Sequence, residues 1–578
     1  MTTTKKYKRL PYGNSNFESL RTENYVYIDK TRFIELLENE DNKNHFFIRP
    51  RKFGKSLFFS MLSHYYDINQ ADKFDTLFGD LYIGKHPTPE RNSYLVLNLD
   101  FSGLDTSGAD DFKVSLSFKV QETVRRFLYK YKSLFPESDI YKQIDAKQPG
   151  VKSLLIAFNA AEAADMKLFV IIDEYDHFAN DLIAQGTNLS ADFYRSVIQA
   201  NGVVRDFYES LKEGSKTVIG RILLTGITPI MLDDLTSGFN ISNNLSLDPN
   251  YNEMLGFTKE EVNRLMKEIG IDKTLINVDM ELLYDGYLFH EDGENRVYNP
   301  SMMLYIFMQI LKFGKLTKNI IDENLKTDYG RLRFLVQTEK NREKLMEISQ
   351  NNSLVSSIIP KFSIDQLHDN KNFVSLLYYM GLLTIDHPEA GGLRLKIPNY
   401  SIRTVYWEYI EGLTRDRNKD VMIDLDIQAS AIWTLANQGD PHPYLDYVSR
   451  DIFSRLSNRD LENFNEKYIK IMLLNGLFQS RIYTTSTELE VSQGYTDIYM
   501  QHSHLFPDLP YEWVWELKYI KKEDAKKVGA KEAKQAEALT QLKKYKESHF
   551  FAGRTDVRFL AVLFIGKDQY EIEEIVNN

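Results

Sequence analysis

Short apolar runs of the kind that form buried parallel strands recur through the first half of the chain. The runs are Phe46–Ile48, Tyr94–Leu99, Leu168–Ile172 and Ile222–Gly226. They are continuous in apolar character and do not alternate, as expected of strands covered on both faces. Stretches with helical periodicity, such as 112–131 and 191–211, separate them. This order predicts a three-layer α/β domain with a parallel sheet over residues 1–245.

The second half of the chain has a different pattern. Residues 246–400 predict a mostly helical lid or adaptor, in which Thr258 and Glu261 have the spacing of a capping box. Residues 401–459 predict a helical linker. Within 460–578 we expect a helix near 460–477, strands around 494–498 and 513–518, a lysine-rich helix over 523–547 and a closing strand over 558–564. This last region therefore predicts a second α/β domain.

Composition limits the classes of function. The chain of 578 residues has no cysteine, which excludes disulfides, thiolate zinc sites and cysteine nucleophiles. It has no apolar leader segment and no run near the roughly 18 apolar residues that cross a membrane. We therefore expect a soluble, cytoplasmic protein with no membrane association. The net charge of −11 offers no global attraction to nucleic acid, so such binding depends on local patches.

A phosphate-binding pattern follows the first apolar run, where a loop that begins at Arg49 ends in Gly54, Lys55 and Ser56. Lysine can reach a β- or γ-phosphate, and the serine hydroxyl can bind Mg²⁺. The loop amides and the helix N-terminus attract the anion. The usual spacing has another glycine at position 49, where this chain has arginine. Taken alone, the tripeptide would also suit an ordinary solvated helix N-terminus.

Further candidates for a nucleotide site lie in the loop and at strand ends. Arg49 and Arg51 could bring guanidinium groups to phosphate, or they could be surface charges. Asp173 and Glu174 follow the third run, at the strand end where open α/β sheets bind ligands. Asp173 is a candidate Mg²⁺ ligand, and Glu174 could orient or deprotonate a water. Thr225 ends the fourth run and is a weaker candidate for contacting the γ-phosphate.

Eight segments together resemble the bacterial AAA-ATPase-like family. They are Leu10–Gly13, Tyr27–Thr31, Arg49–Ser56, Ile172–Asp176, Leu224–Ile227, Leu255–Thr258, Tyr284–Tyr287 and Tyr298–Pro300. In that family the arginine-rich loop is itself the phosphate loop, so the resemblance implies that Arg49 does not argue against an ATP site. Whether ATP is hydrolysed or only bound stays open.

A second group of polar residues lies near the C-terminus. Strand alternation puts Glu516 and Lys518 on one face, with Trp515 and Leu517 on the other. If Asp497 lies opposite on the neighbouring strand, two carboxylates and one amine converge. Such a cluster can bind Mg²⁺ or Mn²⁺, while the lysine positions a water for attack on a phosphodiester. The alternative is an exposed strand face with an incidental Glu-x-Lys.

The order of these residues resembles the PD-(D/E)XK nuclease superfamily, in the version fused after the ATPase-like domain. The resemblance implies that Glu466 is the helical acidic residue and that it shares metal binding with Asp497 and Glu516. It also implies that Asp497 and Glu516 are catalytic, that Lys518 is the catalytic lysine and that Gln541 is an accessory catalytic residue on the next helix.

Other features of this region bear on substrate binding. Tyr495 stands where family members commonly carry arginine, which removes a phosphate contact. Glu488 and Glu490 match acidic positions before the motif, as an extra ligand or a surface charge. From Lys518 to Glu547 there are ten lysines against five acidic residues. These lysines either form an ordinary solvated helix face or bind the phosphate backbone of a nucleic acid.

The two groups of residues lead to one function hypothesis and one alternative. The first is an ATP-gated nuclease that binds ATP and cleaves DNA or RNA with Mg²⁺ or Mn²⁺. The alternative is a signalling or scaffold ATPase whose nuclease-like domain binds nucleic acid or protein without cleavage. The expected partners are ATP and nucleic acid, and the sequence is compatible with a homo-oligomer.

Overall fold

The chain forms two compact units in a computed structural model. The first unit comprises Met1–Lys344 and Val355–Tyr400, and the second comprises Leu345–Leu354 and Ser401–Asn578. The structure describes residues 7–135, 140–144, 148–185, 188–198, 202–231, 241–273, 276, 279–317, 319–323, 325, 338–417, 424–455, 465–487, 489–491 and 494–575. Within these ranges, no helix is both long and apolar enough to cross a bilayer.

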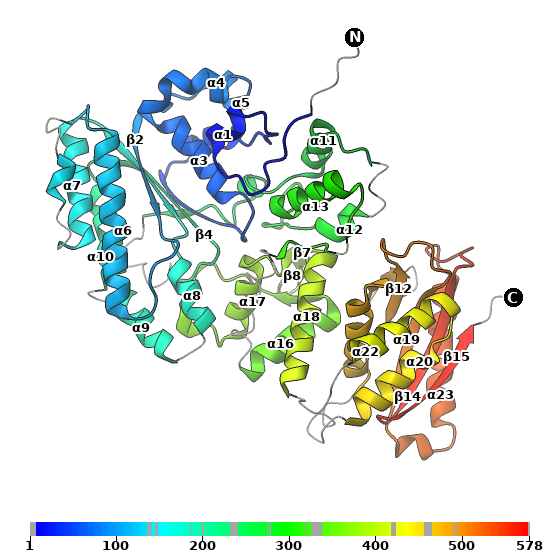
Figure 1. Ribbon diagram of the computed structural model, residues 1–578. Coiled ribbons are helices and arrows are strands. Elements are labelled where there is room, and N and C mark those ends of the chain that lie inside the picture. Colours follow the sequence, from blue (N-terminus) through cyan, green and yellow to red (C-terminus); the bar gives the residue numbers. More distant parts are fainter. Residues whose placement is uncertain are drawn as a thin grey trace, which may run out of the picture. The chain divides into compact units, whose positions relative to one another are not determined.

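A five-stranded parallel sheet lies at the centre of the α/β part of the first unit (Figure 1). Its order is β2-β3-β4-β1-β5. The strands are β1 (Asn44–Ile48), β2 (Tyr94–Asp100), β3 (Lys167–Asp173), β4 (Ile219–Gly226) and β5 (Asn243–Asn244). Most residues of β1 to β4 are buried, which is why these strands appear in the sequence as continuous apolar runs.

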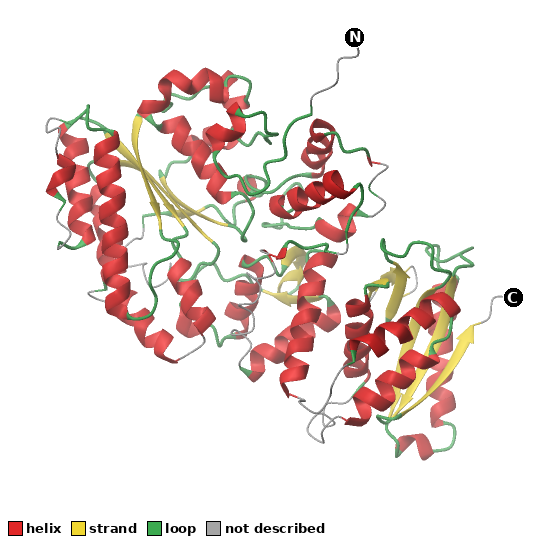
Figure 2. Cartoon of the chain, viewed as in Figure 1, coloured by secondary structure: helices red, strands yellow, loops and turns green. Residues whose placement is uncertain are grey.

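Helices cover both faces of this sheet, with α3 on one face and α6, α7 and α10 on the other (Figures 1 and 2). The helices up to β5 are α1 (Phe17–Thr22), α2 (Arg32–Asn39), α3 (Lys55–Tyr66), α4 (Phe74–Phe78), α5 (Tyr82–Lys85), α6 (Ala109–Lys130), α7 (Gly150–Ala163), α8 (His177–Gln185), α9 (Asn188–Ile198) and α10 (Val203–Gly214). The expected three-layer α/β architecture is confirmed.

The region after this sheet is mainly helical, as expected, and contains a hairpin that the sequence analysis did not predict. Its helices are α11 (Lys259–Ile269), α12 (Met280–Tyr284), α13 (Pro300–Phe313), α16 (Glu339–Asn351) and α17 (Asn370–Tyr379). Strands β7 (Thr384–Glu389) and β8 (Gly392–Lys396) pair antiparallel, in a sheet of order β6-β8-β7 with β6 (Ser353–Ser356). The turn uses Gly391 and Gly392 at φ +97° and +150°, which only glycine adopts easily.

The capping box at the start of α11 is confirmed. The Thr258 hydroxyl accepts from the Glu261 amide at 3.3 Å, and the Thr258 amide donates to the Glu261 carboxylate at 2.8 Å. The same carboxylate accepts from Lys30 Nζ at 2.7 Å. This buried ion pair therefore ties α11 to the segment just before α2.

A second five-stranded sheet, of order β15-β14-β13-β12-β9, forms the centre of the second unit. Its strands are β9 (Tyr483–Ser486), β12 (Ile498–His502), β13 (Glu512–Ile520), β14 (Val557–Ile565) and β15 (Gln569–Ile575), with a separate ribbon of β10 (Leu489–Val491) and β11 (Gly494–Thr496). The main helices of the unit are α18 (Tyr400–Arg417), α19 (Leu425–Gln438), α20 (His442–Asp446), α22 (Glu466–Ser480) and α23 (Ala530–Lys546).

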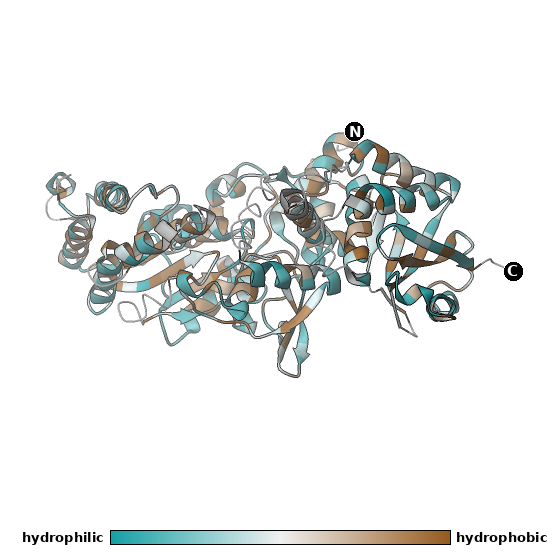
Figure 3. Ribbon diagram, turned by 90° about the horizontal axis from the view of Figure 1, so that it is seen from below, coloured by the Kyte–Doolittle hydropathy of each residue, from teal (hydrophilic) through white to brown (hydrophobic). Residues whose placement is uncertain are grey.

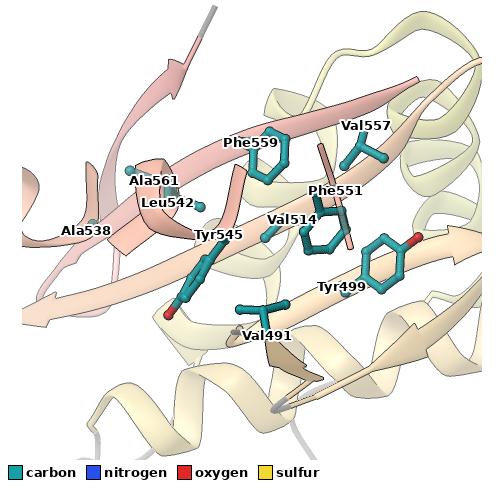
Figure 4. Close-up of a cluster of buried hydrophobic side chains, with 10 residues drawn as sticks. All are labelled: Val491, Tyr499, Val514, Ala538, Leu542, Tyr545, Phe551, Val557, Phe559 and Ala561. Carbon is teal, nitrogen blue, oxygen red and sulfur yellow. The ribbon is translucent and has the colours of Figure 1, made fainter. Parts of the chain in front are cut away.

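The strand alternation predicted for β13 is confirmed by its two packing faces. Val514 faces α23 and joins the buried cluster in Figure 4, together with Leu542 and Tyr545. Trp515 lies on the opposite face, with its ring centroid 6.4 Å from that of Tyr444 in α20. Figure 3 shows hydrophobic stretches along some of the strands and a mixture of hydrophobic and hydrophilic residues along the helices.

A buried carboxylate fixes the exit of strand β4 in the first unit. Asp176 accepts from the amide and hydroxyl of Thr228, both at 2.7 Å, and from Asn180 Nδ2 at 2.7 Å. Gly226 passes directly over this carboxylate and over the ring of Tyr175. The chain therefore needs glycine at 226, because any side chain would displace the buried acid.

We predict that Gly226→Ala is strongly destabilising. The added methyl group would overlap Asp176 Oδ1 and lie 2.6 Å from the Tyr175 ring. We expect the free energy of unfolding to fall by about 3 kcal/mol or more, because steric overlap adds to lost buried hydrogen bonds. Urea unfolding followed by circular dichroism measures this change.

Gly108→Ala is the matched control, because Gly108 is extended and its nearest outside atom is the mobile end of Asp111, at 3.2 Å. This control should cost less than about 1 kcal/mol. Equal losses in the two variants would contradict the role assigned to Gly226.

Candidate active sites

The loop between β1 and α3 has the backbone geometry of an anion-binding turn. Lys52 has φ +65° and Gly54 has φ +96°, and helix α3 begins at Lys55. No neighbouring atom would block a side chain at Gly54, so glycine is favoured there by the backbone angle. Successive turns of this kind point backbone N–H groups toward one concave surface.

Lys55 is buried inside this loop. Its Nζ donates to the carbonyl oxygens of Arg49 at 2.7 Å and Pro50 at 2.9 Å. Burial lowers the pKa of Lys55 to about 8, although the neighbouring charge of Asp173 opposes the shift. The amine is thus held at the mouth of the loop by carbonyl groups that a phosphate oxygen could replace.

Ser56 and Asp173 meet across the end of the sheet. Ser56 Oγ donates to Asp173 Oδ2 at 2.9 Å, which joins the first turn of α3 to the last residue of β3. Burial raises the pKa of Asp173, and the serine hydrogen bond counteracts part of that effect. A hydroxyl and a carboxylate oxygen this close suit a hard cation such as Mg²⁺.

Glu174 follows Asp173 in a left-handed conformation, with φ +52°. Its carboxylate lies 2.9 Å from Nδ1 of His177, whose Nε2 lies 3.2 Å from Asp181. The two acids raise the pKa of His177 to about 9, and the histidine in turn lowers the pKa of Glu174. Glu174 is therefore an ion-paired carboxylate. His177 was not among the expected site residues, although its i, i+4 spacing from Asp181 on α8 was a usable signal.

A cavity of about 640 Å³ opens beside these residues. Its lining includes the charged and polar residues Arg51, Lys55, Ser56, Asp173 and Glu174. It also includes the apolar residues Pro11, Val26, Ile28, Met254, Leu255, Phe257 and Leu265. The volume and the combination of charged and apolar lining residues suit a nucleotide.

Arg49 does not line this cavity, so the expectation that its guanidinium meets phosphate is wrong. The side chain is 1% exposed and donates to the carbonyl oxygens of Ile48, Ser246 and Tyr251 at 2.8–3.0 Å. It also lies 4.0 Å from the Phe289 ring centroid. Arg49 thus fixes the end of β1 to the segment after β5.

Thr225 is also not at the cavity, and its expected contact with the γ-phosphate is wrong. The residue is fully buried, and its hydroxyl donates to the Phe47 carbonyl at 2.7 Å. The side chain therefore ties β4 to β1 inside the sheet. The position of Thr225 at the end of a strand did not indicate that its hydroxyl points toward the neighbouring strand.

Asp497 of the second unit lies at a break between two strands. Strand β11 ends at Thr496 and pairs with β10, whereas β12 begins at Ile498 and pairs with β13. Asp497 Oδ2 accepts from the Leu517 amide at 2.9 Å, and Oδ1 lies 3.3 Å from Lys470 Nζ. The expected single strand over 494–498 is thus divided, and the break turns the carboxylate toward β13.

Glu516 and Lys518 lie on the same face of β13, as predicted. Lys518 Nζ donates to Glu516 Oε1 at 2.8 Å, and the Tyr545 hydroxyl lies 3.3 Å from Glu516 Oε2. Both Glu516 and Lys518 are buried. Burial raises the pKa of Glu516 to about 7, and the neighbouring charge of Asp497 adds to this shift.

Glu466 begins helix α22 and belongs to the same electrostatic group. Burial raises the pKa of Glu466, with a lowering contribution from Lys518 and a raising one from Asp497. Lys470, one turn further along α22, is the buried amine that contacts Asp497. Lys470 was not among the expected site residues, although its i, i+4 spacing from Glu466 places the two on one helix face.

Gln541 lies on α23 one turn before Tyr545, and its Oε1 is buried with no hydrogen-bond partner in the described part of the chain. Glu488 lies outside the described residues, and only the backbone of Glu490 is described. Among the described residues, no three histidine or acidic side chains are grouped as a metal site. The carboxylate oxygens of Asp497 and Glu516 are nevertheless the ligand type that Mg²⁺ and Mn²⁺ take.

Two family models match separate parts of the chain. Residues 11–236 match a model described as a predicted AAA-ATPase, and residues 464–574 match one described as the PD-(D/E)XK nuclease superfamily. A curated relative, "Uncharacterized protein in vnfD 5'region" of Azotobacter chroococcum mcd 1, is 24% identical over 404 residues, which cover 68% of each protein.

Solved structures of two archaeal proteins show weak likenesses. The Aeropyrum pernix ORC2 protein, in ADPNP and ADP complexes, has a TM-score of 0.32 and 11% identity, covering 68% of this chain and 98% of that one. Cdc6p from Pyrobaculum aerophilum has a TM-score of 0.25 and 10% identity, covering 70% and 95%. Likenesses this weak carry no functional argument. The two family matches are in the order expected from the sequence, with similarity to a predicted AAA-ATPase over residues 11–236 followed by similarity to the PD-(D/E)XK nuclease superfamily over residues 464–574.

Proposed function

We propose that this protein binds ATP through its N-terminal domain and cleaves phosphodiester bonds in DNA or RNA, with a divalent metal, through its C-terminal domain. Nucleotide binding at the first site gates cleavage at the second. The observation that carries the nuclease proposal is the position of Asp497 beside Glu516: Asp497 Oδ2 accepts from the amide of Leu517, the residue after Glu516 in β13, at 2.9 Å. Like charges held together in a buried place are typical of a site built for a cation.

At the ATP site, each polar side chain has a distinct role. Lys55 would neutralise the β- and γ-phosphates, and Arg51 would add a second positive charge to the cavity that both line. Ser56 and Asp173 would hold Mg²⁺, which stabilises phosphate charge when bound. Glu174 would orient a water near the γ-phosphate, and His177 fixes the direction of that carboxylate. The apolar residues that line the cavity would contact the nucleotide base.

At the nuclease site, Asp497, Glu516 and Glu466 would hold the divalent cation, which stabilises negative charge on the phosphate when bound. Lys518 orients Glu516 through its 2.8 Å contact and positions the attacking water. Tyr545 fixes the other oxygen of Glu516. Gln541, with its unpartnered oxygen, is placed as an accessory residue on the helix that carries Tyr545.

One observation favours a second candidate function, in which the C-terminal domain binds nucleic acid or protein without cutting. Lys470 contacts Asp497 and Lys518 contacts Glu516, so each carboxylate has an ammonium partner inside the protein. Two such ion pairs could balance the buried charge without any metal. Binding without cleavage in either Mg²⁺ or Mn²⁺ would support this candidate.

We predict that Lys55→Ala weakens ATP binding at least tenfold, because one charge-assisted contact to phosphate contributes about 1.5–3 kcal/mol. Isothermal titration calorimetry with ATP and Mg²⁺ measures the affinity. The control is Lys113→Ala on the outer surface of α6, where the lysine only pairs with exposed Asp110. Unchanged affinity in Lys55→Ala would remove the phosphate-loop assignment.

We predict that Asp497→Ala lowers the cleavage rate at least a hundredfold in Mg²⁺ or Mn²⁺, because it removes a metal ligand and the acceptor of the Leu517 amide. Gel assays on single- and double-stranded DNA and RNA measure the rate. Asp508→Ala is the matched control, since Asp508 is exposed in the turn between β12 and β13. If the wild-type protein cleaves every substrate no faster than the background rate, the proposal of nuclease activity is contradicted.

A further inference from the structure

An exposed aromatic ring lies beside the C-terminal site. Tyr495 is 58% exposed, although it is only two residues from Asp497, an acid of the candidate nuclease site. A single exposed ring needs no ligand to explain it, but an aromatic face in solvent at this position is available to stack on a ligand that approaches Asp497.

The backbone of Tyr495 is fixed to the candidate catalytic residues. The Tyr545 hydroxyl donates to the Tyr495 carbonyl at 2.6 Å, and the same hydroxyl lies 3.3 Å from Glu516 Oε2. Strand pairing with Glu490 holds Tyr495 from the other side. The ring is therefore presented from a fixed strand, at a constant offset from Asp497 and Glu516.

Positive charge without a protein partner lies on the last turn of α23, next to Tyr545. Lys543 and Lys544 are exposed, and no acidic group of the described residues forms an ion pair with either. Four other lysines of this region form ion pairs: Lys522 with Asp568, Lys527 with Asp524, Lys531 with Glu571 and Lys534 with Glu537. Lys521 and Lys526, near the start of the region, are also exposed and form no ion pair with the described residues, so the lysine-rich segment is positive at both ends.

We propose that this edge of the C-terminal domain binds an unpaired nucleic acid strand, with a base stacked on Tyr495 and phosphates near Lys543 and Lys544. The inference rests on the proposed nuclease function and narrows its substrate class. An aromatic ring can stack only on a base face that is free, and duplex bases already stack on one another. Lysines attract the backbone of either form, so Tyr495 is what distinguishes single strands from duplex. DNA and RNA share this chemistry.

Fluorescence anisotropy on the full chain tests this proposal. The probes are a labelled single-stranded DNA, an RNA of the same sequence and the DNA duplex, with EDTA present so that no cleavage occurs. We expect tighter binding of single strands than of duplex. Tyr495→Ala should weaken single-strand binding about tenfold and leave duplex binding unchanged, since one base stack contributes about 1–3 kcal/mol. Lys543→Ala with Lys544→Ala should weaken all probes and lower the salt dependence.

Two control variants keep the outcome interpretable. Tyr495→Phe retains the ring and should bind within about threefold of wild type. Tyr129→Ala removes an equally exposed ring, 56% exposed on α6, and should change nothing. Equal single-strand and duplex affinity, no detectable single-strand binding, or an unchanged preference in Tyr495→Ala would each overturn the proposal.

Failure of this inference is distinguishable from failure of the nuclease function. If single strands bind through Tyr495 but nothing is cleaved, the nuclease proposal fails and the binding surface stands. If cleavage depends on Asp497 while Tyr495→Ala binds every probe like wild type, the nuclease stands and the unpaired-strand surface is wrong.

Discussion

Acidic side chains at and just after the end of strand β3 each have a partner, and these contacts fix the geometry of the N-terminal site. Asp173 is held by Ser56, Glu174 by His177, and Asp176 by Thr228 and Asn180. The contacts join α3, α8 and the exit of β4 at one sheet edge, and those of Asp176 matter most for stability because an unpaired buried carboxylate is costly. The candidate phosphate and metal groups face the cavity as a consequence of this arrangement.

The acidic side chains of the C-terminal domain also have partners, and there the partners are two lysines. Burial raises the pKa of Glu516, Asp497 adds to that rise, and two lysines from different elements offset the charge of the two acids. Lys518 comes from β13 itself, whereas Lys470 reaches in from α22. A cation entering this site would compete with ammonium groups, so metal affinity depends on how readily the lysines move toward substrate phosphate.

The sequence allowed the sheet strands, the Gly54–Ser56 loop end and the shared face of Glu516 and Lys518 to be predicted, because these follow from local periodicity. It could not reveal where Arg49 points, since the carbonyl oxygens of Ser246 and Tyr251 that accept from its guanidinium are about 200 residues further along the chain. The hydroxyl of Thr225 was misassigned for a similar reason, as its acceptor is on a strand distant in sequence. His177 and Lys470 needed tertiary contacts to be recognised.

The central claim is that ATP binding gates cleavage. The most direct test is whether the cleavage rate depends on bound ATP. The measurement is the rate of single-strand cleavage at fixed Mn²⁺, with and without ATP, for the wild-type protein and Lys55→Ala. We expect ATP to change the wild-type rate several-fold and to have no effect on Lys55→Ala, whose rate without ATP should equal that of wild type. Equal rates with and without saturating ATP in the wild-type protein would contradict gating of the nuclease domain by the ATP site.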